Sequence, residues 1–255
     1  MINIGRGHFL TGDCLELMKM IRDNSIDMIL CDLPYGTTQN KWDSVIDFDL
    51  LWEQYWRICK GPVVLTAQCP FDKALGYSQI DYLKYEWICE KSKATGHLNS
   101  KKQPMKSHEN VLVFYKEQCI YNPQDIIKKK IPTIRKGGDN GTNYGKSDKD
   151  AIQEYENYPK SIIYIPSQSN NFHPTQKPVA LFEYLIKTYT NEGALVLDNC
   201  AGSGTTAIAC ENTNRNWICM EKDETYANAA IERIRKHVED NNAKGLPDAG
   251  LRVDI

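Results

Sequence analysis

Residues 195–206 read LVLDNCAGSGTT, a short apolar run followed by an aspartate, two glycines and two threonines. This order predicts a buried strand that turns sharply into a helix. Such a turn lets the backbone approach a ligand at the carboxyl end of a parallel sheet, where open α/β folds bind cofactors. The short spacing of Gly202 and Gly204 fits a dinucleotide fingerprint poorly, and a tight strand-to-helix connection without a ligand explains these glycines equally well.

The next apolar run, residues 217–220, ends at Glu221, about 20 residues beyond the glycines. An acidic side chain at that strand end can accept hydrogen bonds from both hydroxyls of a ribose. The two strand ends together therefore predict a cofactor that contains a nucleoside. A surface glutamate without a ligand is the alternative.

Strand-like and helical stretches alternate through most of the chain. Helices are predicted where apolar residues recur every three or four positions, and strands where short apolar runs end at turn residues. Together they predict an α/β domain with a mostly parallel twisted sheet. One expected helix begins at Asp13, and the others cover 48–59, 179–189, 205–212 and 226–238. The expected strands cover 26–31, 63–67, 85–90, 111–115, 194–198 and 217–220.

Composition narrows the class of protein. The chain has 255 residues, of which 41% are hydrophobic and 25% charged, a mix typical of one large globular domain. It contains no run of 18 apolar residues and no signal-peptide pattern, so we expect a cytoplasmic protein without a membrane partner. The nine cysteines include no C-x-x-C pair, which predicts reduced, mostly buried thiols and no metal site.

Positive charge is concentrated in the middle of the chain. Residues 91–136 contain 11 lysines and arginines but only 3 acidic residues, whereas the whole chain carries a net charge of −2. This polarity favours a polyanionic partner over a merely solvated charged face. From about 117 to 160 the apolar period disappears, which predicts an inserted, partly mobile segment.

A second candidate loop, Asp32-Leu33-Pro34-Tyr35, also follows an expected strand. Proline restricts its own φ and the backbone of its predecessor, so this loop can present a carboxylate, carbonyl oxygens and a ring to one pocket. Asp32 and the Pro34 carbonyl can accept hydrogen bonds from an amino group on a planar ring, and Tyr35 can stack on that ring. A turn with a packed tyrosine is the alternative.

The loop at 32–35 is followed by SHENVLVFYK at 107–116, HPTQKP at 173–178 and the glycine turn at 198–206. In this order, and over nearly the whole chain, the sequence resembles the β class of DNA amino-methyltransferases. The resemblance implies a Rossmann-like fold of permuted order, in which the catalytic loop precedes the cofactor glycines. It also implies S-adenosylmethionine (SAM) as the cofactor.

The resemblance implies roles for individual residues. Asp32, Pro34 and Tyr35 would hold the target base for direct in-line methyl transfer. Glu221 would bind the ribose of SAM, Lys177 would meet its carboxylate, and Asp13 would lie near its adenine or only cap a helix. The full set of implied cofactor residues is Asp13, Cys14, His173, Thr175, Lys177, Asp198, Cys200, Gly202, Gly204, Thr205 and Glu221.

Two positions depart from the family pattern. The loop usually reads Asp-Pro-Pro-Tyr, and Leu33 removes one preset dihedral. The usual Pro-Phe after the cofactor-strand aspartate is Asn199-Cys200, so the apolar wall over the cofactor must come from elsewhere. We expect activity to survive the first change, because the carboxylate, the second proline and the ring remain.

A target amino group inside a duplex is out of reach, so the base is expected to be flipped into the pocket. Family order places target recognition at 117–165, between a catalytic half at 1–116 and a cofactor half at 166–240, with a tail at 241–255. Basic residues of the middle region would meet phosphates, and these are Lys101, Lys102, Lys106, Lys128, Lys129, Lys130, Arg135 and Lys136. Asn140, Asn143 and Tyr144 would reach base edges.

The leading Asp32 favours adenine N6 as the target, because the similar cytosine enzymes more often begin this loop with serine. Cytosine-N4 methylation is the close alternative. A protein glutamine methyltransferase and a DNA-binding module without catalysis are more distant ones. Double-stranded DNA is the implied partner in a bacterial, phage or mobile-element host cell, with a homodimer and a cognate restriction nuclease left open.

Overall fold

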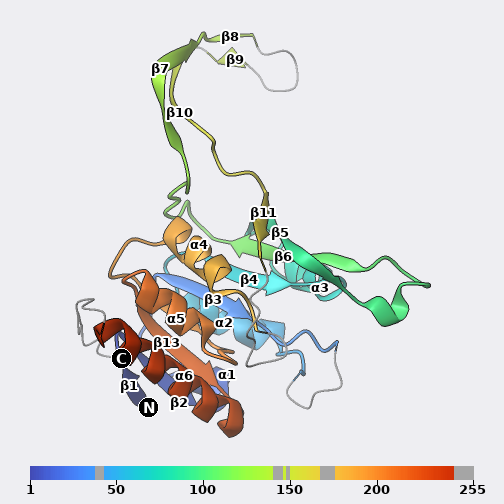
Figure 1. Cartoon of the computed structure of the whole chain (residues 1–255), viewed down its shortest axis with the longest axis vertical. Helices are drawn as coiled ribbons and strands as arrows, with labels where there is room; N and C mark the ends of the chain where they lie inside the picture. The colour runs from blue at the N-terminus through green and yellow to red at the C-terminus, as the bar shows by residue number, and fades with distance from the viewer. Residues whose placement is uncertain (38–42, 140–145, 148–149, 167–175, 244–255) are drawn as a thin grey trace. The chain divides into compact units, whose positions relative to one another are not determined.

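The computed structural model describes residues 1–37, 43–139, 146–147, 150–166 and 176–243. These residues belong to two compact units, one formed by 1–122 with 161–255 and the other by 123–160 (Figure 1). Five of the site residues predicted from the sequence lie outside the described residues. They are Asn140, Asn143, Tyr144, His173 and Thr175.

The larger unit is built on a sheet with the strand order β1-β2-β13-β12-β3-β4-β6-β5-β11. The five strands from β2 to β4 in this order are mutually parallel, whereas β6 is antiparallel to both neighbours. The expectation of an α/β fold with a mostly parallel sheet is therefore confirmed. The strands are β1 (Ile2–Ile4), β2 (Gly7–Thr11), β3 (Met28–Asp32), β4 (Val63–Ala67), β5 (Leu83–Thr95), β6 (Lys106–Phe114), β11 (Ile162–Ile165), β12 (Leu195–Asp198) and β13 (Asn216–Glu221).

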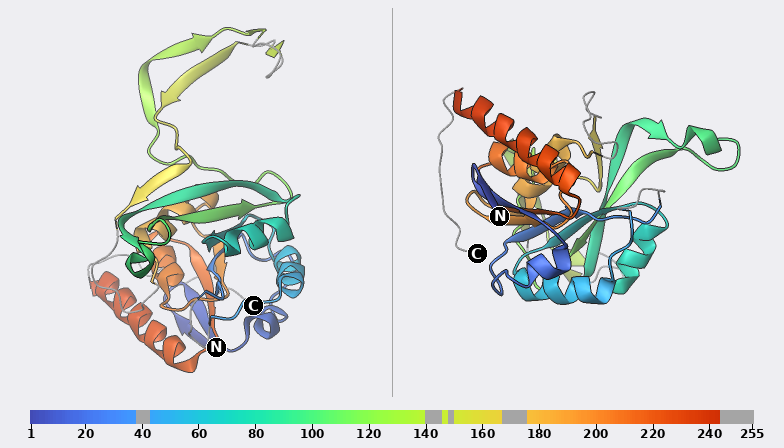
Figure 2. Two further views of the ribbon diagram at one scale, coloured as in Figure 1. Left: turned by 90° about the vertical axis from the view of Figure 1, so that its right-hand side faces the viewer. Right: turned by 90° about the horizontal axis from the view of Figure 1, so that it is seen from below.

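Helices cover both faces of this sheet (Figure 2). Side chains alternate between faces along a strand, so Met28 and Leu30 pack with the helices of one face and Ile29 and Cys31 with those of the other. One face carries α1 (Cys14–Met18), α2 (Phe48–Ile58) and α3 (Phe71–Ser78), and the other carries α4 (Val179–Tyr189), α5 (Thr205–Asn212) and α6 (Glu224–Ala243). None of the helices in the described ranges is both long and apolar enough to cross a membrane.

The two halves of the sheet meet where β3 pairs with β12. Val196 lies opposite Met28 and Leu197 opposite Ile29 in parallel register. From β3 the chain continues through α2 to β4 on one side, and from β12 it continues through α5 to β13 on the other. These diverging connections create the switch point at which open α/β sheets bind ligands.

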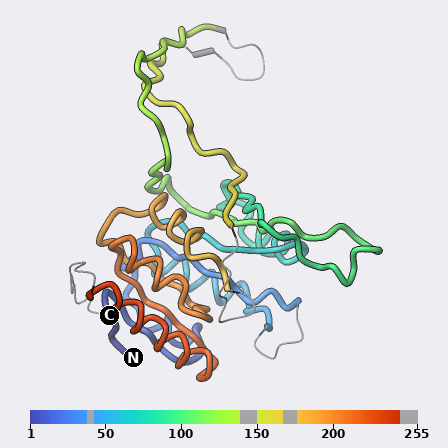
Figure 3. The backbone as a smooth tube through the Cα atoms, in the orientation of Figure 1, coloured from blue at the N-terminus to red at the C-terminus, as the bar shows by residue number. Residues whose placement is uncertain are grey.

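Several elements match the sequence prediction and others do not. The helices at 179–189 and 205–212 and the strand at 63–67 have the expected bounds. The strand expected at 85–90 is much longer, and β5 and β6 form a hairpin that projects from the sheet (Figure 3). The strand β11 lies within the expected 117–165 insertion but pairs in parallel with β5.

The smaller unit is a two-stranded ribbon of β7 (Ile127–Arg135) and β10 (Ala151–Glu156), with a short pair of β8 (Gly138–Asp139) and β9 (Lys146–Ser147). Ile134 and Ile152 lie opposite each other, and both are exposed, at 65% and 66%. Strands that bury neither face need no alternation of polar and apolar residues. The sequence pattern of this region therefore looked irregular although it forms strands.

Candidate active site

A cavity of about 870 Å³ lies at the switch point between β3 and β12. Its walls come from the loops after these strands, the end of β13 and the base of the β5–β6 hairpin. Among the described residues expected in the site, only Gly204 is absent from the lining. The expected residues that do line the cavity are Asp13, Cys14, Asp32, Pro34, Tyr35, Lys177, Asp198, Cys200, Gly202, Thr205 and Glu221.

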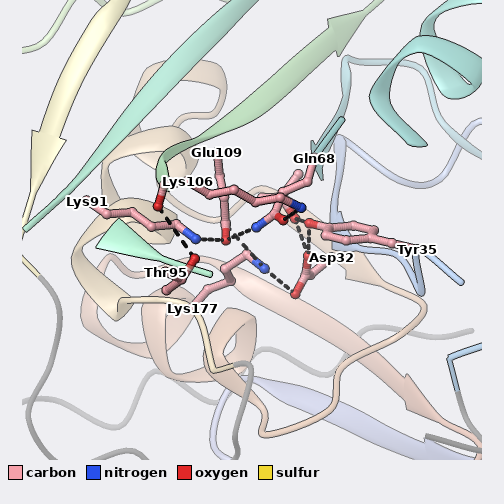
Figure 4. A network of polar contacts seen from close by, with 9 residues as sticks. Asp32, Tyr35, Gln68, Lys91, Thr95, Lys106, Glu109 and Lys177 are labelled. Carbon is pink, nitrogen blue, oxygen red and sulfur yellow. Dashed lines mark hydrogen bonds and ion pairs between the residues drawn. The ribbon is translucent and has the colours of Figure 1, made fainter. Parts of the chain in front are cut away.

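The carboxylate of Asp32 is held through both of its oxygens (Figure 4). Oδ1 accepts a hydrogen bond of 2.6 Å from the Tyr35 hydroxyl and another from the hydroxyl of Thr66, which lies opposite Asp32 in the β3–β4 register. Oδ2 forms an ion pair with Lys177 Nζ at 2.6 Å. The orientation of this carboxylate is therefore set by three neighbouring side chains before any substrate binds.

Tyr35 is both a hydrogen-bond donor and part of an aromatic wall. Its ring stacks on Phe71 with a centroid distance of 5.0 Å and an interplanar angle of 30°. Burial and the neighbouring charge of Asp32 raise the pKa of Tyr35 well above its usual range, so its hydroxyl stays protonated and continues to donate. The ring expected to stack on a substrate thus already has one aromatic partner.

Lys177 connects Asp32 to a second carboxylate, that of the buried Glu109. Its Nζ lies 3.4 Å from Glu109 Oε2, while Glu109 Oε1 contacts Lys91 Nζ and accepts a hydrogen bond of 2.9 Å from Gln68 Nε2. Burial alone would raise the pKa of Glu109, but the ammonium groups of Lys177 and Lys91 outweigh it and hold this pKa at about 2. Glu109 is therefore ionised at neutral pH.

Two of the residues predicted to contact ligands have partners within the protein. Lys177, predicted at the carboxylate of the cofactor, pairs with Asp32 and Glu109, which neutralise an ammonium that is only 9% exposed. Lys106, predicted on a phosphate, donates from Nζ to Gln68 Oε1 at 3.1 Å. Both assignments stay predictions. Glu109 has no role that follows from the sequence, although it belongs to the SHENVLVFYK run that carries part of the family resemblance.

Around the glycine turn the cavity carries two further carboxylates, the buried Asp198 and the half-buried Glu221. Asp198 accepts hydrogen bonds from the Cys200 backbone N–H at 3.1 Å and from the Thr206 hydroxyl, and burial raises the pKa of Asp198 to about 6. Glu221 accepts hydrogen bonds from the Gly202 and Asp223 backbone N–H groups, each at 2.9 Å, and burial raises its pKa as well.

The two glycines of the turn serve different purposes. Gly202 has a φ of 49°, and a Cβ placed there would meet no atom within 4 Å. Gly204 has a φ of 75°, and its Cβ would lie 2.9 Å from Ile234 of α6. Gly202 therefore faces open space in the cavity, whereas Gly204 allows α5 and α6 to pack.

Asp13 and Cys14 close the cavity on the α1 side. Asp13 caps α1 by accepting a hydrogen bond from the Leu15 backbone N–H at 3.0 Å. The hydrogen bond and charge of Lys222 lower the pKa of Asp13. Cys14 and Cys200 both line the cavity. The capping function considered for Asp13 is thus present in the fold.

The catalytic loop and the glycine turn both lie within residues 26–232, over which the chain matches a family model for N6/N4 methyltransferases described as DNA methylase. This chain belongs to the DNA methylase family. The membership inferred from the order of the motifs is thereby confirmed.

Curated relatives of this DNA methylase are similar over most of its length. It is 25% identical over 246 residues to the type II methyltransferase M.HpaI of Haemophilus parainfluenzae, with 88% of this chain and 73% of that protein covered. It is 26% identical over 251 residues to the DNA adenine methyltransferase YhdJ of Escherichia coli strain K12, with 88% and 81% covered.

Solved structures share the fold of this DNA methylase. M1.HpyAVI in its SAM complex aligns with a TM-score of 0.61 at 23% identity and covers 89% of this chain and 98% of that one. The cytosine-N4-specific PvuII DNA methyltransferase aligns with a TM-score of 0.63 at 16% identity and covers 96% and 95%. The expected Rossmann-like methyltransferase fold with permuted order is confirmed.

Burial of Asp198 makes stability depend on pH. Its pKa of about 6 in the folded chain exceeds its ordinary value of 3.8, so between these values the folded chain holds a proton that the unfolded chain has released. The contribution of this group to stability is highest below about pH 4 and decreases as the pH rises through about 6. Asp198→Asn cannot titrate. We expect the free energy of unfolding of the wild type, relative to this variant, to decrease by on the order of 2 kcal/mol from pH 4 to pH 7.

Urea unfolding of both proteins across this pH range, without ligand, measures the difference. A difference that stays constant with pH would show that Asp198 is ionised throughout and that its burial has been offset by its hydrogen bonds.

Proposed function

We propose that this DNA methylase transfers the methyl group of SAM to the N6 amino group of an adenine flipped out of double-stranded DNA. The observation that carries the proposal is the Asp32 carboxylate, fixed by Tyr35, Thr66 and Lys177 in the same cavity as the glycine turn. Asp32 favours adenine, and the relative YhdJ is named a DNA adenine methyltransferase. Cytosine N4 is the alternative target, and sequencing of the methylated DNA distinguishes the two bases.

The residues around the glycine turn suit SAM. A cavity of about 870 Å³ falls within the roughly 300–1,000 Å³ of ordinary cofactor sites. Gly202 leaves room for a ligand against the backbone, and Glu221 retains unused lone pairs for ribose hydroxyls. When bound, SAM supplies a methyl group on a positively charged sulfur, which keeps the electron pair of the broken bond.

Asp32 would orient the target amine and accept its proton. The amino nitrogen donates a hydrogen bond to the carboxylate, which aligns its lone pair and increases its electron density. As the nitrogen gains the methyl group it becomes positively charged and must release one proton. A nearby anion stabilises this developing charge and is a ready acceptor for the proton. Tyr35 keeps the carboxylate in place throughout, because its own hydroxyl stays protonated.

DNA would contact two basic parts of the chain. The β5–β6 hairpin carries five lysines and no acidic residue between 91 and 108, and Lys91, Lys93 and Thr95 at its base line the cavity. In the smaller unit, Lys128 and Lys130 are exposed on β7. A two-stranded ribbon has the width of the DNA major groove, which supports target recognition by 123–160.

The proposed function is tested by incubating the protein with SAM labelled in its methyl group and with separate DNA, RNA and protein acceptors. We expect label in DNA only, and sequencing of the product should place it on adenine N6 at a recurrent site. Label on cytosine N4 would select the alternative base. Label in protein only, or in no acceptor, would overturn the proposal.

Asp32→Ala should abolish methyl transfer, with a decrease in kcat of at least about 100-fold, because the amine loses its hydrogen-bond acceptor. The Kd for SAM should change by less than about threefold, since Asp32 follows β3 whereas the glycine turn follows β12. Single-turnover kinetics and calorimetric titration measure the two quantities. Asp81→Ala, at an exposed position outside the cavity lining, is the matched control. A wild-type rate in the Asp32 variant would remove this residue from catalysis.

Gly202→Asp and Gly204→Ala should affect different properties, the first the affinity for SAM and the second the stability of the fold. The first places a carboxylate into open space beside Glu221, so SAM affinity should fall more than about tenfold with only about 1 kcal/mol of strain from the left-handed backbone. The second forces a Cβ against Ile234, which should cost about 1–3 kcal/mol of stability. Calorimetric titration and urea unfolding separate the two effects. Equal destabilisation by both changes would contradict the distinction.

Changing Lys128, Lys129 and Lys130 together to alanine should weaken DNA binding and flatten its dependence on salt. The slope of log K against log salt should decrease by about one for each lysine that contacts a phosphate. Fluorescence anisotropy at several salt concentrations measures this slope. Lys19, Lys60 and Lys236, changed together, provide a control outside the basic region. An unchanged slope in the β7 variant would exclude these lysines from phosphate contact.

A further inference from the structure

Lys177 is a buried ammonium between two carboxylates. Its Nζ lies 2.6 Å from Asp32 Oδ2 and 3.4 Å from Glu109 Oε2, and only 9% of the residue is exposed. It also lies over the ring of Tyr35, 5.5 Å from the centroid. Lys177 therefore contacts both the carboxylate and the ring that the catalytic loop offers to a substrate.

This position conflicts with the binding of a target amine. Oδ1 of Asp32 already accepts hydrogen bonds from Tyr35 and Thr66, so Oδ2 is the oxygen with capacity left for the amine. In the structure that oxygen is paired with Lys177. A base that donates its amino hydrogen to Oδ2 must compete with a full positive charge.

Glu109 offers the displaced ammonium another partner. Lys91 and Gln68 hold its Oε1, whereas Oε2 faces Lys177. The carboxylate is ionised, and its lowered pKa agrees with a strongly cationic environment. Because a buried ammonium without a counter-ion is very unfavourable, a second carboxylate within 4 Å makes release from Asp32 feasible.

We infer that Lys177 is a placeholder that shifts from Asp32 to Glu109 when the target amino group enters, and returns when the methylated base leaves. The inference rests on the proposed function and applies equally to adenine and cytosine. Glu109 is then a positioning residue that acts through Lys177. Once Asp32 has passed the accepted proton to water, Lys177 competes with the one remaining N–H of the methylated amine for the carboxylate and thereby favours release of the product.

Removing the charge of Glu109 tests the exchange. In Glu109→Gln the ammonium loses its alternative counter-ion and stays on Asp32, so KM for DNA should rise at least about tenfold. The Kd for SAM should change by less than about threefold. Glu109→Asp, which keeps the charge, should recover most of the affinity for DNA. Glu90→Gln, at the exposed acidic residue of the neighbouring strand, is the matched control.

The double variant Lys177→Met with Glu109→Gln separates exchange from mere structural support. It removes the competing ammonium together with its partner, so the KM for DNA should return to within about threefold of the wild type. If the two changes instead add to each other, or if Glu109→Gln weakens SAM binding as much as DNA binding, the inference is wrong. The double variant keeps charge balance and so tests the exchange even if Glu109→Gln alone fails to fold.

Failure of this inference can be told apart from failure of the proposed function. A wild-type protein that methylates no DNA would overturn the function and with it the inference. A wild-type protein that methylates DNA, together with a Glu109→Gln variant of unchanged KM, would overturn the inference alone.

Discussion

The site depends on the parallel pairing of β3 with β12. These two strands are far apart in the sequence, yet their register places Val196 opposite Met28 and brings Asp32 and Asp198 to the same edge of the sheet. A slip of one residue would exchange the faces on which Val196 and Leu197 pack, and each belongs to a different hydrophobic cluster. Burial on both faces thus fixes the relative position of the catalytic loop and the glycine turn.

The cavity built on this pairing has two electrostatically different sides. On the β3 side, Asp32 and Glu109 share Lys177, and cationic neighbours keep the pKa of Glu109 at about 2. On the β12 side, burial raises the pKa of both Asp198 and Glu221, and hydrogen-bond donors rather than cations hold them. The first side is neutralised from within the protein, whereas the second would gain from a positively charged ligand. A sulfonium cofactor on the second side and a neutral base on the first suit this division.

The sequence predicted what local patterns determine and missed what tertiary contacts determine. The helix at 179–189 and the strand at 63–67 follow from apolar periodicity, and the position of Asp32 and Glu221 in one cavity follows from motifs at strand ends. The strand β11 was missed because it lies beside a segment without apolar period and pairs with β5 at a distance in the chain. The partnership of Lys177 with Glu109 was equally invisible, since it joins residues of separate motifs through space.

The departures from the family motif are explained by packing. Leu33 replaces a proline that would restrict the loop, but its side chain is only 4% exposed within the cluster that also holds α1, α2 and α3. The leucine side chain buries one carbon more than a proline would, which is worth about 0.8 kcal/mol and matches the roughly 0.4–1 kcal/mol by which a proline reduces the freedom of the unfolded chain. Asn199 is likewise anchored, because its Oδ1 accepts a hydrogen bond of 2.6 Å from the buried Tyr55 hydroxyl. The loop and the turn are thus held by the core of the α2 face, so rigidity that the family motif obtains from proline arises here from side-chain burial.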